Sequence, residues 1–193
     1  MGSLILEGEA LFKSASLFYG HGTECAYDEA LYIVLSITGN LPLVDNTVFG
    51  RVVDEATQRR IHILFQQRIE EKLPAAYLLG EAWFAGLPFF VDESVLVPRS
   101  PFAELIADGF APWVEKSKTK TILDLCTGSG CIGTACAVQF PEAEVDISDI
   151  SKTALRVANK NIVRHGLESR VNVIESDLYV GLRDKQYDFG LCR

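Results

Sequence analysis

A glycine-rich turn near the middle of the sequence has the residue types and spacing of a ligand site. The apolar run Ile122–Leu125 predicts a buried strand, residues 126–130 read Cys-Thr-Gly-Ser-Gly, and a helix is predicted from about Cys131. Gly128 and Gly130 allow a tight turn and let a ligand approach the backbone without a Cβ in the way. The first N–H groups of the helix are also unpaired there. This combination is typical of a nucleotide-binding turn.

Acidic residues end the next two predicted strands. Asp149 lies 19 residues after the second glycine, at the end of the apolar stretch Ala143–Ile150. An acid at this place accepts hydrogen bonds from a ribose diol in nucleotide-binding folds. We take Asp149 rather than Asp146 as the ribose acid, because Asp149 ends the strand. A third strand, Val171–Glu175, is followed by Ser-Asp, which places Asp177 at its end.

The glycines alone leave two other interpretations open. The sequence Gly-Ser-Gly-Cys-Ile-Gly at 128–133 fits the dinucleotide pattern, but glycine turns also serve plain packing. A nicotinamide-dependent oxidoreductase is therefore one alternative. Against it stands Asp124, which is predicted inside the first strand, where a buried acid is costly without a cationic or hydrogen-bonding partner. The positively charged end of S-adenosylmethionine would supply such a partner.

The elements around the turn alternate between strand and helix. After the helix to about Phe140 and the strand to Asp149, a helix is predicted over Ser151–His165, before the strand from Val171. This order predicts an α/β fold with a parallel sheet and right-handed crossovers. Ligands in such sheets bind at the carboxyl ends of the strands, where Cys126, Asp149 and Asp177 all fall.

The first part of the chain reads as helical. Tyr27–Thr38 shows helical spacing, and Asp54 can cap a second helix. The inward face of that helix is expected to carry Ile61, Leu64, Phe65, Ile69 and Leu73. Residues 81–97 instead look like strands, with a turn predicted at residues 85–88. Ser100 can then cap a helix that begins at Pro101. The hairpin can be a rigid linker between domains.

Composition and charge limit the classes of protein and partner that the sequence can represent. The chain of 193 residues is 48% hydrophobic and 23% charged, which excludes wholesale disorder. A net charge of −8 argues against nucleic-acid binding and favours a basic protein partner, although mild acidity can also serve solubility alone. Five cysteines without a Cys-x-x-Cys pair and three scattered histidines predict neither a disulfide framework nor a metal site. We expect a cytoplasmic location and no membrane segment.

Five blocks of the sequence together resemble bacterial protein-glutamine methyltransferases of the HemK type. The closest likeness is to the branch that methylates large-subunit ribosomal protein three. The blocks are residues 19–23 (Tyr-Gly-His-Gly-Thr), 75–78 (Ala-Ala-Tyr-Leu), 82–84 (Ala-Trp-Phe), 91–101 (Val-Asp-Glu-Ser-Val-Leu-Val-Pro-Arg-Ser-Pro) and 124–131 (Asp-Leu-Cys-Thr-Gly-Ser-Gly-Cys). The resemblance runs from about Leu17 to Asp188.

The resemblance implies three parts and a cofactor. Residues 1–80 would be a helical domain that recognises the substrate, residues 81–100 a hairpin linker, and residues 101–193 an incomplete Rossmann-like domain for S-adenosylmethionine. The cofactor would contact Asp124, Cys126, Thr127, Gly128, Ser129, Gly130, Asp149, Asp177 and Leu178. A second set would form a wall of the active site: Phe84, Pro98, Arg99 and Glu104. The substrate would be a glutamine side chain in a basic ribosomal protein.

One block of the family is missing. The fourth strand of the family runs into Asn-Pro-Pro-Tyr, which grips the substrate amide, whereas here residues 187–193 read Tyr-Asp-Phe-Gly-Leu-Cys-Arg. We therefore expect no catalytic residue up to Arg193 and no methyl transfer by the chain as given. A cofactor-binding or partner-binding module without catalysis is the main alternative. An uncovered sheet edge would also favour self-association.

Overall fold

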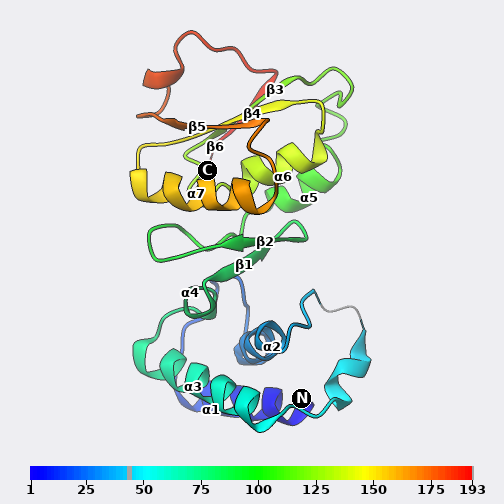
Figure 1. The fold of residues 1–193 in the computed structure, drawn as a ribbon, viewed down its shortest axis with the longest axis vertical. Helices are drawn as coiled ribbons and strands as arrows, with labels where there is room; N and C mark the ends of the chain where they lie inside the picture. The colour runs from blue at the N-terminus through cyan, green and yellow to red at the C-terminus, as the bar shows by residue number, and fades with distance from the viewer. Residues whose placement is uncertain (43–44, 193) are drawn as a thin grey trace. The chain divides into compact units, whose positions relative to one another are not determined.

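The chain folds into two units, Met1–Gly80 and Glu81–Arg193 (Figure 1). The computed structural model describes residues 1–42 and 45–192. Within these residues no helix is both long and apolar enough to cross a membrane.

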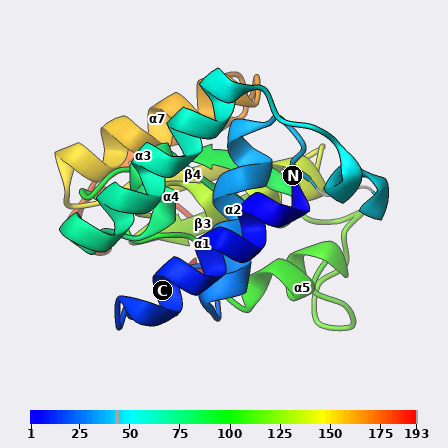
Figure 2. The same cartoon turned by 90° about the horizontal axis from the view of Figure 1, so that it is seen from below.

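The first unit is built from helices. They are α1 Gly2–Ser14, α2 Ala26–Ile37, the 3-10 helix η1 Asn46–Gly50, α3 Glu55–Glu71 and the short α4 Ala75–Leu79 (Figure 2). Helices α1 and α3 pack closely because α1 carries Gly8, where a Cβ would lie 2.5 Å from the ring of Phe65. The predicted helix over 27–38 is confirmed, and so is the cap of α3, since Asp54 accepts a hydrogen bond from Thr57 N at 3.0 Å.

A buried ion pair joins four parts of the first unit. Arg68 on α3 donates to Glu29 on α2 at 2.9 Å and to the Phe18 carbonyl at 2.9 Å. The other carboxylate oxygen of Glu29 accepts from Ala75 N at 3.1 Å. Both charged side chains are almost fully buried. The apolar spacing of α3 did not predict Arg68 on its inward face. Burial of that charge is possible because Glu29 on α2 offsets its desolvation cost, and the spacing of α3 does not reveal this partner.

The second unit contains a four-stranded parallel sheet. Its strands are β3 Thr121–Leu125, β4 Glu144–Asp149, β5 Val171–Glu175 and β6 Phe189–Cys192, in the order β5-β4-β3-β6. Helices α5 Phe102–Ala107, α6 Cys131–Gln139 and α7 Lys152–Arg164 lie on one side of the sheet (Figure 1). The α/β class and these strand and helix positions confirm the sequence-based prediction.

The direction of winding reverses at β3. The chain passes from β3 through α6 to β4 and through α7 to β5, and β6 then pairs with the free side of β3. A reversal of this kind opens a crevice at the carboxyl ends of the two central strands, which is where ligands bind in open α/β sheets. The glycine turn leaves β3 at that point.

The two faces of the sheet differ in what covers them. Val145, Ile147 and Ile122 belong to the main apolar core with α6 and α7. On the other face Leu123 and Leu125 pack with Leu182, from the 3-10 helix η2 Val180–Leu182.

The same face explains Asp146, which interrupts the aliphatic pattern of its strand. Its carboxylate accepts hydrogen bonds from Lys185 Nζ at 2.6 Å, Tyr187 Oη at 2.7 Å and Asn172 Nδ2 at 2.9 Å. Asp146 therefore fixes the segment that leads into β6.

The hairpin is shorter than predicted and lies within the second unit. Strands β1 Glu81–Phe84 and β2 Leu87–Phe90 are antiparallel, and no strand follows over residues 91–97. The predicted four-residue turn at 85–88 is wrong: Ala85 and Gly86 both have positive φ and form a two-residue turn, so Leu87 and Pro88 join β2. Helix α5 begins at Phe102 rather than Pro101, and Ser100 Oγ accepts from Phe102 N at 3.2 Å, as expected of a cap.

Candidate functional site

The segment Cys126–Gly130, here called the glycine loop, leaves β3 with an unusual backbone. Cys126, Gly128 and Gly130 all have positive φ, at 59°, 57° and 77°. The loop is tied down at Thr127, whose N–H donates to the Ser148 carbonyl of β4 at 2.9 Å. Its conformation is therefore held by the neighbouring strand as well as by its own glycines.

The glycines of this region serve different purposes. A Cβ on Gly128 would meet nothing within 4 Å, so the space beside it is open. A Cβ on Gly130 would lie 3.0 Å from the Cβ of Ala158 on α7, and one on Gly133 would lie 2.3 Å from Ile147 on β4. Gly130 and Gly133 thus let helices pack closely, and Gly128 is the glycine that leaves room for a ligand.

Asp124 is buried beneath the glycine loop. Its Oδ2 accepts hydrogen bonds from Gly133 N at 2.8 Å and from the Thr127 hydroxyl. Gly133 is in the first turn of α6, where the helix dipole also favours a negative charge. Sequence analysis attributed the stabilisation of the buried Asp124 carboxylate to a cationic ligand. The structure shows that the protein's own hydrogen-bond donors supply part of that stabilisation.

Asp149 joins the end of β4 to the glycine loop. Its two carboxylate oxygens each accept one backbone N–H at 2.9 Å, Oδ2 from Gly128 and Oδ1 from Ser151. The carboxylate is partly exposed. Each oxygen of a carboxylate has a second lone pair, so Asp149 can still accept hydrogen bonds from ligand hydroxyls.

The loop after β5 completes the edge. Ser176 N donates to the Asp149 carbonyl at 3.0 Å, and Ser176 Oγ donates to the Leu178 carbonyl at 2.7 Å and accepts from Gly181 N at 2.9 Å. Asp177 and Leu178 are exposed on this loop. The structure therefore brings the predicted residues of three strand ends to one edge of the sheet. Sequence reasoning assigned no role to Ser176, because its burial and its hydrogen bonds are visible only in the structure.

The four residues predicted to form an active-site wall differ in burial. Phe84 is in the apolar core, where its ring meets that of Phe89 with centroids 6.5 Å apart. Pro98 is buried, whereas Arg99 and Glu104 are exposed. Phe84 thus supports the hairpin from within, and a role beside a substrate stays a prediction for all four.

The cysteines carry free thiols. Burial raises the pKa of the Cys126 thiol, with Cys192 and Asp149 adding to the effect, so its nucleophilic thiolate is disfavoured. Cys131 and Cys136 are buried in α6. Across the described residues no group of three or more His, Cys, Asp or Glu side chains could hold a metal ion.

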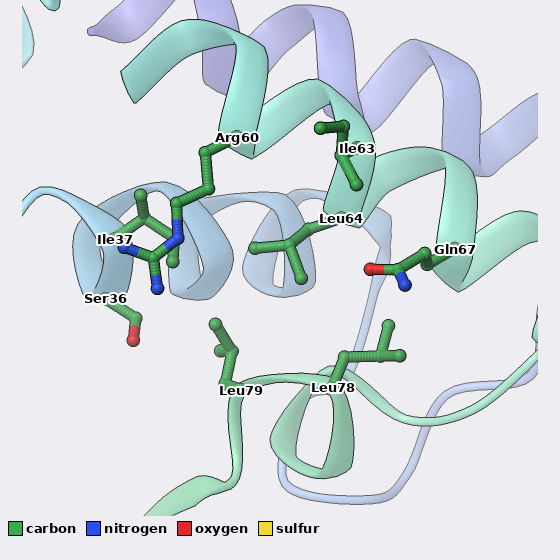
Figure 3. A pocket seen from close by; sticks show the side chains of 8 residues that line it. All are labelled: Ser36, Ile37, Arg60, Ile63, Leu64, Gln67, Leu78 and Leu79. Carbon is green, nitrogen blue, oxygen red and sulfur yellow. The ribbon is translucent and has the colours of Figure 1, made fainter. Parts of the chain in front are cut away.

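A separate hollow of about 320 Å³ lies in the first unit, between α2, α3 and α4. Figure 3 shows Leu64, Leu78 and Leu79 facing this space, with Arg60 and Gln67 on opposite sides of it. The sequence did not predict this hollow, because its lining comes from three helices that are apart in the chain.

Comparison with known proteins finds a family match in the second unit. Residues 108–192 match the family described as "Methyltransferase small domain". Among solved structures, the methyltransferase domain of METTL16 covers 56% of this chain with 22% identity and a TM-score of 0.44, an overlap too partial to carry any conclusion on function.

Three curated relatives carry the same name, ribosomal protein uL3 glutamine methyltransferase. The protein of Francisella tularensis is 43% identical over 90% of this chain, that of Neisseria gonorrhoeae 44% over 89%, and that of Xanthomonas campestris 45% over 96%. These matches cover 55%, 58% and 60% of the relatives' own lengths, so the chain spans little more than half of each.

The second unit, with its parallel sheet and the glycine loop at the switch point, matches the methyltransferase small domain family over residues 108–192. At 43–45% identity the named relatives are glutamine methyltransferases of a ribosomal protein, which confirms the resemblance to protein-glutamine methyltransferases found in the sequence.

Proposed function

We propose that the second unit binds S-adenosylmethionine at the glycine loop, and that the protein serves the methylation of a glutamine side-chain nitrogen in ribosomal protein uL3. The observation that carries the proposal is the bridge from Asp149 to Gly128 at the switch point of the sheet. It puts a carboxylate beside Gly128, where a Cβ would meet nothing within 4 Å. The names of the relatives supply the substrate.

The residues of the edge fit the parts of this cofactor. Asp149 has lone pairs for the ribose diol, and the exposed side chain of Leu178 offers an apolar contact for adenine. The charges of Asp124 and Asp149 favour a cationic group near the loop, and the cofactor carries two, its α-ammonium and its sulfonium. When bound, the sulfonium supplies a methyl group with a good leaving group. The protein's part is to place it, since the amide nitrogen is a poor nucleophile.

The first unit would recognise the substrate in this proposal, with residues 81–100 between it and the cofactor domain. The net charge of −8 suits a basic ribosomal protein. A ribosomal substrate would also place the protein in the cytoplasm. A nicotinamide oxidoreductase is the alternative for the same loop, and a module that binds without catalysis is the alternative for the whole chain.

Calorimetric titration tests the cofactor. We expect S-adenosylmethionine and S-adenosylhomocysteine to bind and NADH not to bind. Asp149→Ala removes charge-assisted hydrogen bonds worth about 1.5–3 kcal/mol, which corresponds to roughly 10- to 150-fold weaker binding. Unchanged affinity would remove Asp149 from the site, and preferential binding of NADH would overturn the methyltransferase function.

The substrate is tested in the cell that makes the protein. Deleting its gene should remove one methyl group from a glutamine of ribosomal protein uL3, which intact-mass and peptide mass spectrometry of the ribosome would detect. Reintroducing the intact gene should restore the methyl group. A uL3 mass that does not change on deletion would overturn the proposed substrate while leaving the cofactor assignment standing.

A further inference from the structure

Helix α7 touches both the glycine loop and the hairpin. At its middle Ala158 packs against Gly130. Toward its C-terminal end three residues at helical spacing, Asn161, Arg164 and His165, contact the hairpin. The helix is therefore a rigid connection between the predicted cofactor site and a hairpin that sequence analysis treats as a linker.

Asn161 is the one of these residues that also reaches the loop. Its Oδ1 accepts from Phe90 N at 2.6 Å, and its Nδ2 donates to the Phe90 carbonyl at 3.0 Å and to the Ser129 carbonyl at 2.8 Å. The side chain is fully buried. An asparagine amide has two N–H donors and one carbonyl oxygen, so both donors and the oxygen are in use.

This arrangement suits asparagine better than other residues. The amide pairs with both backbone groups of Phe90, as a neighbouring strand would. An aspartate would place a carboxylate oxygen against the Phe90 and Ser129 carbonyls, and an apolar side chain would leave three backbone groups without these hydrogen bonds in a buried place.

We propose that Asn161 is a positioning residue that joins the hairpin to the glycine loop, so that a ligand held by the loop also steadies Phe90. The Ser129 carbonyl sits between two residues of positive φ in a loop that has to present its N–H groups in one orientation. Asn161 holds that carbonyl in place through its Nδ2 hydrogen bond. Coupling of this kind is reciprocal. If the ligand stabilises the hairpin contact by some factor, loss of that contact must lower the affinity for the ligand by the same factor.

Arg164 provides a matched control on the same helix. It pairs with Glu81 at 2.6 Å and lies over the ring of Phe90 at 4.7 Å, so it holds the hairpin. Both partners, Glu81 and Phe90, belong to the hairpin and not to the glycine loop. Arg164→Met should therefore loosen the hairpin without disturbing the loop, whereas Asn161→Ala should disturb both.

The first test needs no ligand. Amide hydrogen exchange followed by NMR should be faster at Gly128 and Gly130 in Asn161→Ala than in the wild-type chain, and unchanged at both in Arg164→Met. Asn161→Asp keeps the size of the side chain and should act like Asn161→Ala. Equal exchange at the loop in the Asn161 and Arg164 variants would show that Asn161 only stabilises the fold, and would overturn the inference.

The second test rests on the proposed function and uses S-adenosylhomocysteine. Saturation of the wild-type chain should slow exchange at Phe90 N–H, and Asn161→Ala should abolish that change and weaken binding by about 5-fold or more. Arg164→Met, which leaves the hydrogen bonds of Asn161 in place, should weaken binding less than Asn161→Ala does. If the wild-type chain does not bind the compound, the proposed function fails and the first test alone decides. Binding without any change at Phe90 overturns the coupling, even if no Asn161 variant folds.

Discussion

Glu29 in the first unit and the two acids beside the glycine loop in the second unit are stabilised in different ways. In the first unit Glu29 is neutralised by Arg68, and its second oxygen accepts a backbone N–H. In the second unit Asp124 and Asp149 accept hydrogen bonds from backbone N–H groups and a hydroxyl. These neutral donors stabilise a carboxylate but do not cancel its charge.

This difference separates a structural acid from an acid that can serve a ligand. The Glu29–Arg68 pair ties α2 to α3, to the loop at Phe18 and to the start of α4, and its charges largely cancel. The edge of the sheet in the second unit instead keeps negative charge beside an open glycine. We conclude that burial of a carboxylate says little about function until the charge of its partner is known.

The largest expected effect is a loss of stability when the Glu29–Arg68 ion pair of the first unit is removed. Arg68→Met leaves Glu29 buried without its cation, which costs about 3–5 kcal/mol of unfolding free energy. Urea unfolding of the full chain, with hydrogen exchange to localise the loss to residues 1–80, measures it. The double variant Glu29→Met with Arg68→Met should recover much of the loss. Single-variant stability equal to that of the wild type would show that the pair contributes nothing.

Two glycines of the second unit, Gly128 and Gly166, allow an effect on ligand binding to be separated from an effect on stability. Gly128 and Gly166 have similar positive φ, 57° and 65°, and a Cβ on either would meet nothing within 4 Å. Alanine at each should therefore cost a similar amount, about 1–2 kcal/mol of backbone strain. Only Gly128→Ala fills space beside Asp149. Only this variant should therefore weaken the binding of S-adenosylhomocysteine by more than the loss of stability explains.

Calorimetry and thermal unfolding of the two variants together decide the point. Equal affinities in Gly128→Ala and Gly166→Ala would move the ligand away from the glycine loop. A much larger loss of stability in Gly128→Ala would instead make the loop a packing feature, which was the plainest alternative from the sequence.

Sequence patterns predicted the elements better than the partners. The strands β3, β4 and β5 and the cap at Asp54 depend on neighbouring residues, and they were found. Hydrophobic periodicity reports which face of an element is buried but not what it meets. Arg68 and Asn161 were missed for that reason, since their partners lie 39 and 71 residues away.

The candidate site shows the same limit. Asp149 was identified because its position at a strand end can be read from spacing. The partners of Asp124 lie only 3 and 9 residues ahead, at the start of a predicted helix, so the hydrogen bond to Gly133 could have been predicted from the helix N-terminus. The bond from Gly128 to Asp149 could not, because it depends on the pairing of β3 with β4.

The smallest expected effect concerns Asp146, a charge-paired acid in the second unit. Burial opposes its ionisation, but hydrogen bonds from Lys185, Tyr187 and Asn172 outweigh burial and lower the pKa of Asp146. A carboxyl group whose pKa is lower in the folded state stabilises the fold above its unfolded pKa of about 3.9, and this contribution is lost as the pH falls through the folded pKa.

Asp146→Asn should therefore reduce the unfolding free energy at pH 7 and make progressively less difference below about pH 4. The loss should be about 1 kcal/mol or less, because the Lys185 side chain is 44% exposed and solvent screens the pair. Urea unfolding of both chains at several pH values measures it, and Lys185→Met should remove most of the same pH dependence. A difference that stays constant down to pH 3 would contradict the assignment. Because Asp146 is paired as Glu29 is, its loss should also leave the affinity for S-adenosylhomocysteine unchanged, in contrast to the loss of Asp149.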